Sequence, residues 1–257
     1  MEQVINKTKH EESISIDAED ILYRELNAML RDLNSKGIQK VKLNNVYGQR
    51  YIGTDLSLPM DIEISGTPGN DLGAFMNGQK ITVYGNAQDC CGNTMNNGEI
   101  VIHGHAGDIL GMSARGGKIF VRDDAGYRAG IHMKEYQDKK PVIVIGGTTQ
   151  DFVGEYMGGG VLIMLGLNLG KEIQHKAKFI GTGMHGGVIY LRGQVEQYQL
   201  GKEVGVTQLS EKDHQVVHDN VNEFASYFKL DPDKILEQRF IKLFPRWLRP
   251  YGKLYTY

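Results

Sequence analysis

A short pattern of alternating apolar residues, ending at a turn position, recurs at a nearly fixed interval through the middle of the chain. Its first copy reads Ile-Glu-Ile-Ser-Gly at residues 62–66. The closing positions are 66, 85, 104, 123, 146, 166 and 193, which gives spacings of 19, 19, 19, 23, 20 and 27 residues. A second signature, Gly-x-x-Met, runs in phase with the first and begins at Gly73 and Met76. Of the 33 glycines, 29 lie between residues 48 and 193, so the glycine excess belongs to this repeat.

A repeat of this period restricts the chain to a solenoid. Each unit contains one short strand with period-2 alternation, and a single coil cannot bury its own apolar face, whereas stacked coils share a continuous core. Because no helical pattern separates the strands, the spacing favours a parallel β-helix over a leucine-rich repeat. We expect at least six stacked parallel coils between about residues 43 and 193. Their interior column is predicted to contain Ile62, Ile81, Ile100, Ile119, Val142 and Leu162.

A second column precedes the glycine of each Gly-x-x-Met signature. Its members are Leu72, Cys91, Leu110, Ala129, Val153 and Ile180. Every one of them is apolar, so this column is predicted to face the core. Cys91 is therefore interpreted as a small buried hydrophobe and not as a nucleophile. Cys90 belongs to a mixed column, which predicts a less buried position.

The two ends of the chain differ from the repeats, and we expect one domain over residues 1–257 with three parts. Residues 1–37 are predicted to be an N-terminal helical segment, residues 38–195 the β-helix repeats, and residues 196–257 a helical and aromatic C-terminal tail. In the first part, apolar residues at helical spacing predict a helix over residues 17–36, with Asp17 as its N-cap and Gly37 as its stop. Residues 38–46 are then predicted to form the first strand.

The C-terminal part contains two helix signals and an aromatic stretch. Residues 211–228 place Val217, Val221, Phe224 and Phe228 on one helical face. Asp231-Pro232 is typical of a helix start. Residues 240–257 are aromatic and basic, and we expect them to pack along the solenoid or against a partner.

Composition excludes several classes of protein. The formal net charge is −2 and the pI is about 6.5, so no basic surplus is present to bind nucleic acid. No apolar run approaches the length of a membrane span, and residues 1–12 are polar and unlike a signal peptide. The two adjacent cysteines cannot build a disulfide framework. These features predict a cytoplasmic protein.

Two glycine-rich segments resemble nucleotide-binding motifs. Residues 181–186 match G-x-G-x-x-G, but a strand pattern follows at residues 188–191 where a dinucleotide site needs a helix. We therefore interpret this segment as a solenoid corner. Residues 166–171 end in Gly-Lys but lack the P-loop spacing and its Ser or Thr.

Four histidines near the repeats are candidate metal ligands. His103 and His105 lie at a strand end, and in register His105 stacks between Asn86 and Asp124. A metal site with two histidines and a carboxylate is conceivable there, but Gly104 interrupts the strand, so a surface polar ladder is favoured. His132 and His185 flank repeat corners with no carboxylate in register. No residue is therefore assigned a catalytic, cofactor-binding or metal-binding role.

The glycine-rich coils resemble a known family. Segments such as residues 69–78 (Gly-Asn-Asp-Leu-Gly-Ala-Phe-Met-Asn-Gly) and 151–160 (Asp-Phe-Val-Gly-Glu-Tyr-Met-Gly-Gly-Gly) look like the C-terminal domain of the large subunit of glutamate synthase. The resemblance covers about residues 43–193, and residues 240–245 are similar to the end of that domain. That domain is a right-handed parallel β-helix named for its G-x-G-x-G motifs. Subunits of formylmethanofuran dehydrogenase and of N-methylglutamate synthase resemble the same domain.

The resemblance implies an architectural role. In glutamate synthase, an N-terminal cysteine performs the glutaminase reaction, and FMN and an iron–sulfur cluster lie on a barrel domain. This chain has neither that cysteine nor a cluster-binding set of cysteines. The resemblance therefore implies a non-catalytic, cytoplasmic scaffold subunit of a multi-subunit glutamate synthase-like oxidoreductase, which serves glutamate biosynthesis in nitrogen metabolism. The expected partners are a flavin and iron–sulfur synthase subunit and a glutaminase subunit, and this chain is expected to carry no cofactor.

Two alternatives stay open at this point. The same β-helix could serve a formylmethanofuran dehydrogenase-like or N-methylglutamate synthase-like complex. The chain could also be a stand-alone enzyme that acts on a small ligand at the His103/His105 surface. The sequence leaves a homo-oligomer open as well.

Overall fold

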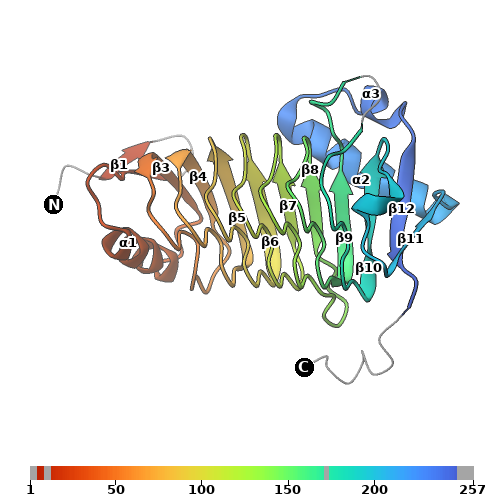
Figure 1. Cartoon of the computed structure of the whole chain (residues 1–257). Coiled ribbons are helices and arrows are strands. Elements are labelled where there is room, and N and C mark those ends of the chain that lie inside the picture. Colours follow the sequence, from red (N-terminus) through yellow and green to blue (C-terminus); the bar gives the residue numbers. More distant parts are fainter. Residues whose placement is uncertain (1–4, 9–12, 171–173, 248–257) are drawn as a thin grey trace.

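The computed structural model describes residues 5–8, 13–170 and 174–247. These residues form a β-solenoid whose strands make one 12-stranded sheet along the stack (Figure 1). The strands are β1 (Ile5–Thr8), β2 (Ser13–Asp17), β3 (Lys40–Tyr47), β4 (Asp61–Thr67), β5 (Asn77–Tyr84), β6 (Asn97–Ile102), β7 (Lys118–Val121), β8 (Val142–Ile145), β9 (Gly158–Met164), β10 (Gly186–Arg192), β11 (Val204–Thr207) and β12 (Phe240–Pro245). The helices are α1 (Tyr23–Ser35), α2 (Glu211–Phe228) and α3 (Pro232–Leu236), with a 3-10 turn at Gln197–Gln199.

The strands stack in parallel, as the repeat predicts. Every neighbouring pair from β2 to β10 is parallel. Ile62, Ile81 and Ile100 pair directly across β4, β5 and β6, and all three are fully buried. The predicted solenoid is therefore confirmed, and its core is a column of branched side chains that runs the length of the stack.

The predicted register is wrong by one residue in the coil between β7 and β8. Ile119 of β7 pairs with Ile143 of β8, and Ile143 pairs with Leu162, so Ile143 and not Val142 lies in the interior column. Val142 faces the outside of the sheet. The matching turn position is therefore residue 147 and not 146. All four residues of β8 are apolar and buried, so the alternation that fixes the register in other coils gives no signal here.

The corners explain the Gly-x-x-Met signature. Gly92 adopts φ +70°, which a residue with a side chain rarely tolerates. A Cβ at Gly92 would also lie 2.4 Å from the Cδ1 atom of Ile119, one coil further along. Gly154 has the same relation to Ile189, and Gly181 has it to Val204 of β11. The second predicted column is confirmed, since its members are at most 1% exposed: Leu72, Cys91, Leu110, Ala129, Val153 and Ile180.

The N-terminal end of the stack is closed by α1, and its helix prediction needs a correction. α1 begins at Tyr23 with Leu22 as its N-cap, so the assignment of Asp17 as N-cap is wrong. Asp17 instead ends β2, which pairs in parallel with β3 and adds a strand before the predicted first one. The alternation Ser-Ile-Ser-Ile-Asp at residues 13–17 carries that strand signal. Gly37 follows the helix with φ +78°, as predicted.

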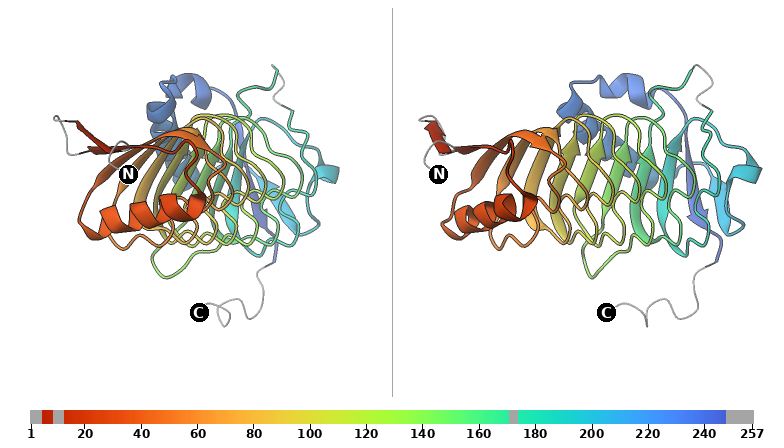
Figure 2. Two further views of the ribbon diagram at one scale, coloured as in Figure 1. Left: turned by 90° about the vertical axis from the view of Figure 1, so that its left-hand side faces the viewer. Right: turned by 60° about the vertical axis from the view of Figure 1, so that its left-hand side comes forward.

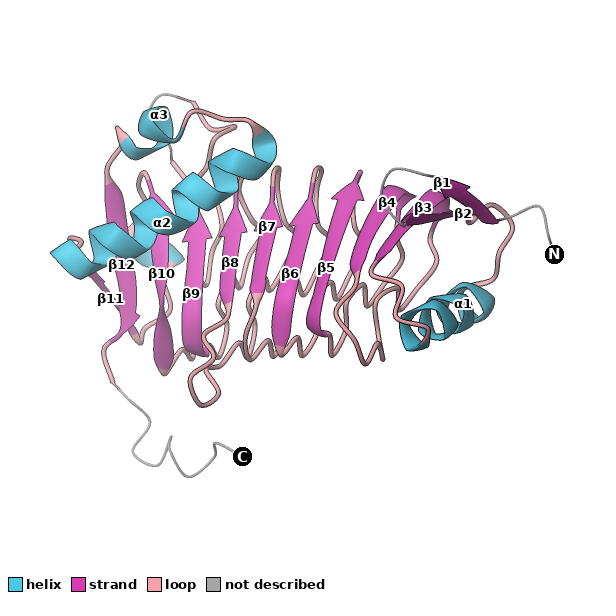
Figure 3. Cartoon of the chain, turned by 180° about the vertical axis from the view of Figure 1, so that it is seen from behind, coloured by secondary structure: helices cyan, strands magenta, loops and turns pink. Residues whose placement is uncertain are grey.

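The C-terminal end carries the other two helices. α2 has the predicted limits and lies across the outer face of the sheet, as Figure 3 shows. The residues predicted to share one face of α2 pack together on the sheet: Val217, Val221 and Phe224 are buried, and Phe228 is partly buried against the same cluster. β12 pairs antiparallel with β10 and β11, which ends the parallel stack. Figure 2 shows α1 at one end of the coils and α2 and α3 outside them near the other. Residues 248–257 of the predicted aromatic tail lie outside the described residues.

Candidate functional site

The His105 position is a polar ladder, as predicted. The backbone N–H of His105 donates to Asn86 Oδ1 (2.9 Å), and the backbone N–H of Asp124 donates to His105 Nδ1 (3.2 Å). Asp124 Oδ1 in turn accepts from the backbone N–H of Thr148 (2.6 Å) and from Asn168 Nδ2 (2.9 Å). Each side chain thus accepts a backbone N–H of the following coil, so the ladder links neighbouring coils along the stack.

His103 takes no part in that ladder. Its ring lies 5.0 Å from the Tyr84 ring and 5.1 Å from the Phe228 ring at the end of α2. Burial, and then the nearby Arg122 charge, lower the pKa of His103. The two histidines of the conceivable metal site therefore serve separate contacts. Among the residues that the structure describes, no three His, Cys, Asp or Glu side chains are grouped so that they could hold a metal ion.

The remaining sequence motifs are corners of the solenoid. Gly181 (φ +67°) and Gly183 (φ +72°) turn the chain directly into β10, so residues 181–186 form a corner as predicted. His132 stacks on Tyr156 with ring centroids 5.4 Å apart, and His185 Nδ1 lies 3.3 Å from the carbonyl oxygen of Gly183. Lys171, at the end of the Gly-Lys segment, lies outside the described residues.

The two cysteines are free thiols in different environments. Cys91 is 1% exposed, and burial raises its pKa far above the ordinary thiol value. Cys90 is partly exposed, and its pKa is raised by burial and then by Asp71, Asp89 and Asp108. A thiol with a raised pKa forms little thiolate at neutral pH and is a poor nucleophile.

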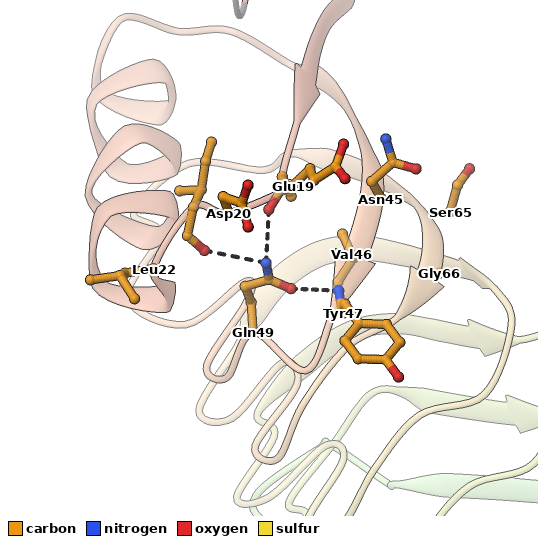
Figure 4. Close-up of a pocket in the computed structure, with 11 residues that line it drawn as sticks. Glu19, Asp20, Leu22, Asn45, Val46, Tyr47, Gln49, Ser65 and Gly66 are labelled. Carbon is orange, nitrogen blue, oxygen red and sulfur yellow. Dashed lines mark hydrogen bonds between the residues drawn. The ribbon is translucent and has the colours of Figure 1, made fainter.

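A cavity of about 870 Å³ lies between the start of α1 and strands β3 and β4. Figure 4 shows Gln49 at its centre, with Glu19 and Asp20 near its edge. Gln49 Nε2 donates to the carbonyl oxygens of Ala18 (2.9 Å) and Ile21 (3.2 Å), and its Oε1 accepts the backbone N–H of Tyr47 (2.6 Å). The buried Gln49 amide therefore uses its hydrogen bonds within the fold, where it fixes the segment that leads to α1.

The same arrangement recurs elsewhere, which marks it as structural. Gln79 Nε2 donates to the carbonyls of Leu56 and Leu58. Gln199 Nε2 donates to the carbonyls of His175 and Ala177. In each case a buried glutamine satisfies two carbonyl groups of an irregular loop in the preceding coil, as the burial of such groups requires.

A polar cluster at the N-terminal end of α2 was missed by the sequence analysis. Asp213 Oδ1 accepts from the Tyr190 hydroxyl (2.6 Å) and from Lys242 Nζ (2.7 Å), while its Oδ2 accepts from Ser210 Oγ (2.6 Å). Ser210 is the N-cap of α2 and Asp213 is its third residue, which is a capping box. The motif Ser-x-x-Asp was visible at residues 210–213, but its contacts with β10 and β12 were not.

Two ionisable groups of this cluster have strongly shifted pKa values. Burial alone would raise the pKa of Asp213, but hydrogen bonds from Lys242, Ser210 and Tyr190 hold it well below its ordinary value. Burial, and then Asp213, raise the pKa of Tyr190. At neutral pH the carboxylate cannot take up a proton and the phenol cannot lose one. The cluster therefore suits attachment of α2 to the sheet better than acid–base chemistry.

Comparisons with known proteins identify the family and the fold. The model of the GXGXG motif family matches residues 26–249. An uncharacterised protein of Methanocaldococcus jannaschii is 50% identical over 256 residues, which cover 95% of this chain and 97% of that one. A chain in the crystal structure of the formyltransferase/hydrolase complex from Methylorubrum extorquens, solved with methylofuran, superimposes with a TM-score of 0.63 at 17% identity, covering 92% of this chain and 93% of that one. At that identity the superposition establishes the shared fold alone.

None of the described helices is both long and apolar enough to cross a membrane. The family match over residues 26–249 contains the whole repeat and its corner glycines. The chain therefore belongs to the GXGXG motif family, the family of the C-terminal domain of the glutamate synthase large subunit.

Proposed function

We propose that this chain is a non-catalytic scaffold subunit of a multi-subunit, glutamate synthase-like oxidoreductase in the cytoplasm. The observation that carries the proposal is that the polar groups singled out above are engaged in holding the solenoid together. His105, Gln49 and Asp213 each satisfy backbone or side-chain partners within the fold. Family membership supports the same role, since the family includes the C-terminal domain of the glutamate synthase large subunit, which is architectural in that enzyme.

The chemistry of glutamate synthesis requires groups that this chain does not supply. Release of ammonia from glutamine needs an activated nucleophile, and reductive amination needs a redox cofactor. An iron–sulfur cluster takes four thiolates, whereas this chain has two cysteines and one is in the core. FMN and the cluster are therefore assigned to a partner synthase subunit, and ammonia release to a glutaminase subunit.

The surface offers places for such partners to dock. Several large aromatic side chains are exposed, including Tyr47 (92%), Tyr198 (74%) and Trp247 (64%). Aromatic residues are enriched at protein–protein interfaces because they bury much area at low entropic cost. Their distribution over both ends of the solenoid suits a subunit that contacts more than one partner.

Affinity purification of the chain from its native source tests this proposal. We expect a flavin-containing partner to co-purify. We expect the isolated chain to be colourless and to make no glutamate from glutamine and 2-oxoglutarate. A yellow or brown isolated chain, or turnover by the chain alone, would contradict the scaffold role.

A second candidate is a scaffold in a formyltransferase/hydrolase-type complex. The observation that favours it is the superposition on a chain of such a complex over 92% of this chain. The identity of the co-purified partner separates the two candidates: a flavoprotein supports the first, and a flavin-free formyl-transferring enzyme supports the second. The stand-alone enzyme at the His103/His105 surface loses its geometric basis, since the two rings make unrelated contacts.

A further inference from the structure

A cavity of about 650 Å³ lies where the N-terminal end of α2 meets β9, β10 and β12. Three lysines from three separate parts of the chain line it: Lys140, Lys212 and Lys242. Lys140 comes from the extended loop before β8, Lys212 from the first turn of α2, and Lys242 from β12. Their convergence is a property of the fold, because no stretch of sequence brings them together.

The lysines are not fully neutralised by the carboxylates of the cavity. Lys242 Nζ lies 2.7 Å from Asp213 Oδ1, and Lys140 Nζ lies 3.6 Å from Glu135 Oε1. Lys212 has no carboxylate within ion-pair distance among the described residues. Lys212 also sits in the first turn of α2, where the helix dipole already favours negative charge. The cavity therefore keeps a net positive charge.

The two carboxylates of the cavity are themselves held in place. Glu135 Oε1 also accepts the backbone N–H of Gly160 (3.1 Å), and Asp213 is fixed by Tyr190 and Ser210. Neither can readily turn toward Lys212. An anion that enters the cavity therefore meets Lys212, which has no ion-pair partner among the described residues, and Lys140, whose ion pair with Glu135 is long (3.6 Å) and half exposed.

The walls indicate the size and kind of ligand. Gly160, Gly186 and Gly187 leave part of the lining without side chains, while Val188 and Phe244 supply apolar surface. A cavity of this volume is in the range of sites for small molecules. We propose that this lysine cavity binds a small molecule that bears a carboxylate or phosphate group, with Lys212 and Lys140 contacting the anion and Lys242 held by Asp213 as part of the wall.

Calorimetric titration of the full chain with inorganic phosphate and, separately, with citrate tests the inference at low salt. We expect saturable binding of at least one anion, which weakens as sodium chloride is added. The variant Lys140→Gln/Lys212→Gln should weaken that binding about tenfold, since each exposed charge contributes about threefold. The matched control is Lys176→Gln/Lys202→Gln, which removes two exposed lysines outside the cavity and should bind as wild type does.

Thermal melting checks that both double variants are folded. We expect both to melt near wild type, because none of the four lysines makes a described contact that the fold depends on. Binding of phosphate alone assigns the site to phosphate ligands, and binding of citrate alone assigns it to carboxylates. The absence of binding by both anions would overturn the inference. An equal loss of affinity in the two double variants would overturn it as well, because the effect would then come from overall charge and not from the cavity.

Discussion

The outer face of the sheet changes character along the solenoid, whereas the inner face does not. One outer row, read across paired strands, is Lys40, Asp61, Lys80, Glu99, Lys118, Val142, Val161 and Val188. It alternates in charge from β3 to β7 and is apolar from β8 to β10. The inner column stays apolar and buried throughout. The repeat therefore determines the solenoid fold, whereas the residues of the outer rows determine whether water or a helix covers that face.

The two halves of the outer face meet different demands. In the charged half, neighbouring strands present opposite charges, as in the pair Lys80–Glu99 (2.7 Å), and the face can remain in water. The neighbouring outer row, which contains Thr82, Val101 and Phe120, becomes apolar earlier, at β6, and we count its apolar part with the apolar half. There Phe120, Val144 and Ile163 form a second buried cluster with Val221 and Phe224 of α2. α2 also reaches the boundary, where the Tyr227 hydroxyl donates to Glu99 Oε2 (2.7 Å). α2 therefore covers the apolar half and ends over the last charged strands, where Lys80 Nζ lies 4.9 Å from the centre of the Tyr227 ring.

The largest effect is expected where the apolar half is broken. Phe120 is fully buried under α2, and Phe120→Ala should lower the free energy of unfolding by about 3–5 kcal/mol through lost burial and the cavity left behind. Thr82 occupies the same outer row two coils earlier, so Thr82→Ala is the matched control and should change it by no more than about 0.5 kcal/mol. Chemical denaturation measures both. Similar losses would mean that the two halves do not differ as described.

The attachment of α2 over the apolar half depends next on Asp213. Asp213→Asn should cost about 1.5–3 kcal/mol, since it removes charged hydrogen bonds at a buried position. The folded-state pKa of Asp213 is lowered, so its stabilising effect is complete above the unfolded pKa of about 3.9 and is lost as the pH falls through the folded pKa. The stability difference between wild type and Asp213→Asn should therefore be constant near neutral pH and shrink in acid. A difference that grows in acid would contradict the contact scheme.

Substitution of the two adjacent cysteines tests whether the inner column is apolar and buried at Cys91. Cys91→Ser should destabilise the fold by about 1–3 kcal/mol, because it places a hydroxyl in an apolar column. Cys90→Ser should cost less, because Cys90 is partly exposed at a corner. Thermal melting of the two variants makes the comparison, and equal shifts would count against the inward column.

The smallest effect is expected in the charged half. Lys80→Gln should lower the free energy of unfolding by about 0.2–1 kcal/mol, and less at high salt, because the Lys80 side chain is 43% exposed. Denaturation in low and high sodium chloride measures it. A larger, salt-independent loss would mean that this face is more buried in solution than the structure shows, as it would be beneath a partner or a second copy.

The inner columns could be predicted from the sequence because alternation and corner glycines report directly on which side faces the core. The prediction failed at Val142 because β8 is apolar on both faces, and at Asp17 because a five-residue strand precedes the helix closely. The outer face was harder to predict. The sequence predicts the apolar face of α2. It does not predict where that face packs, because the packing depends on side chains such as Phe120 that lie about a hundred residues earlier. The lysine cavity could not be predicted either, because its three lysines come from parts of the chain that are far apart in sequence.

The corner glycines have a mechanical consequence. Each corner is filled by a side chain of the coil that follows it, so a coil is complete only when its successor is in place. At the end of the stack Val204 of β11 fills the corner of Gly181, in the position that an isoleucine of a further coil would take. β11 thus covers the last coil: a chain pulled from its C-terminal end loses β12, α3 and α2 first and Val204 next, and the coils then open in order toward α1.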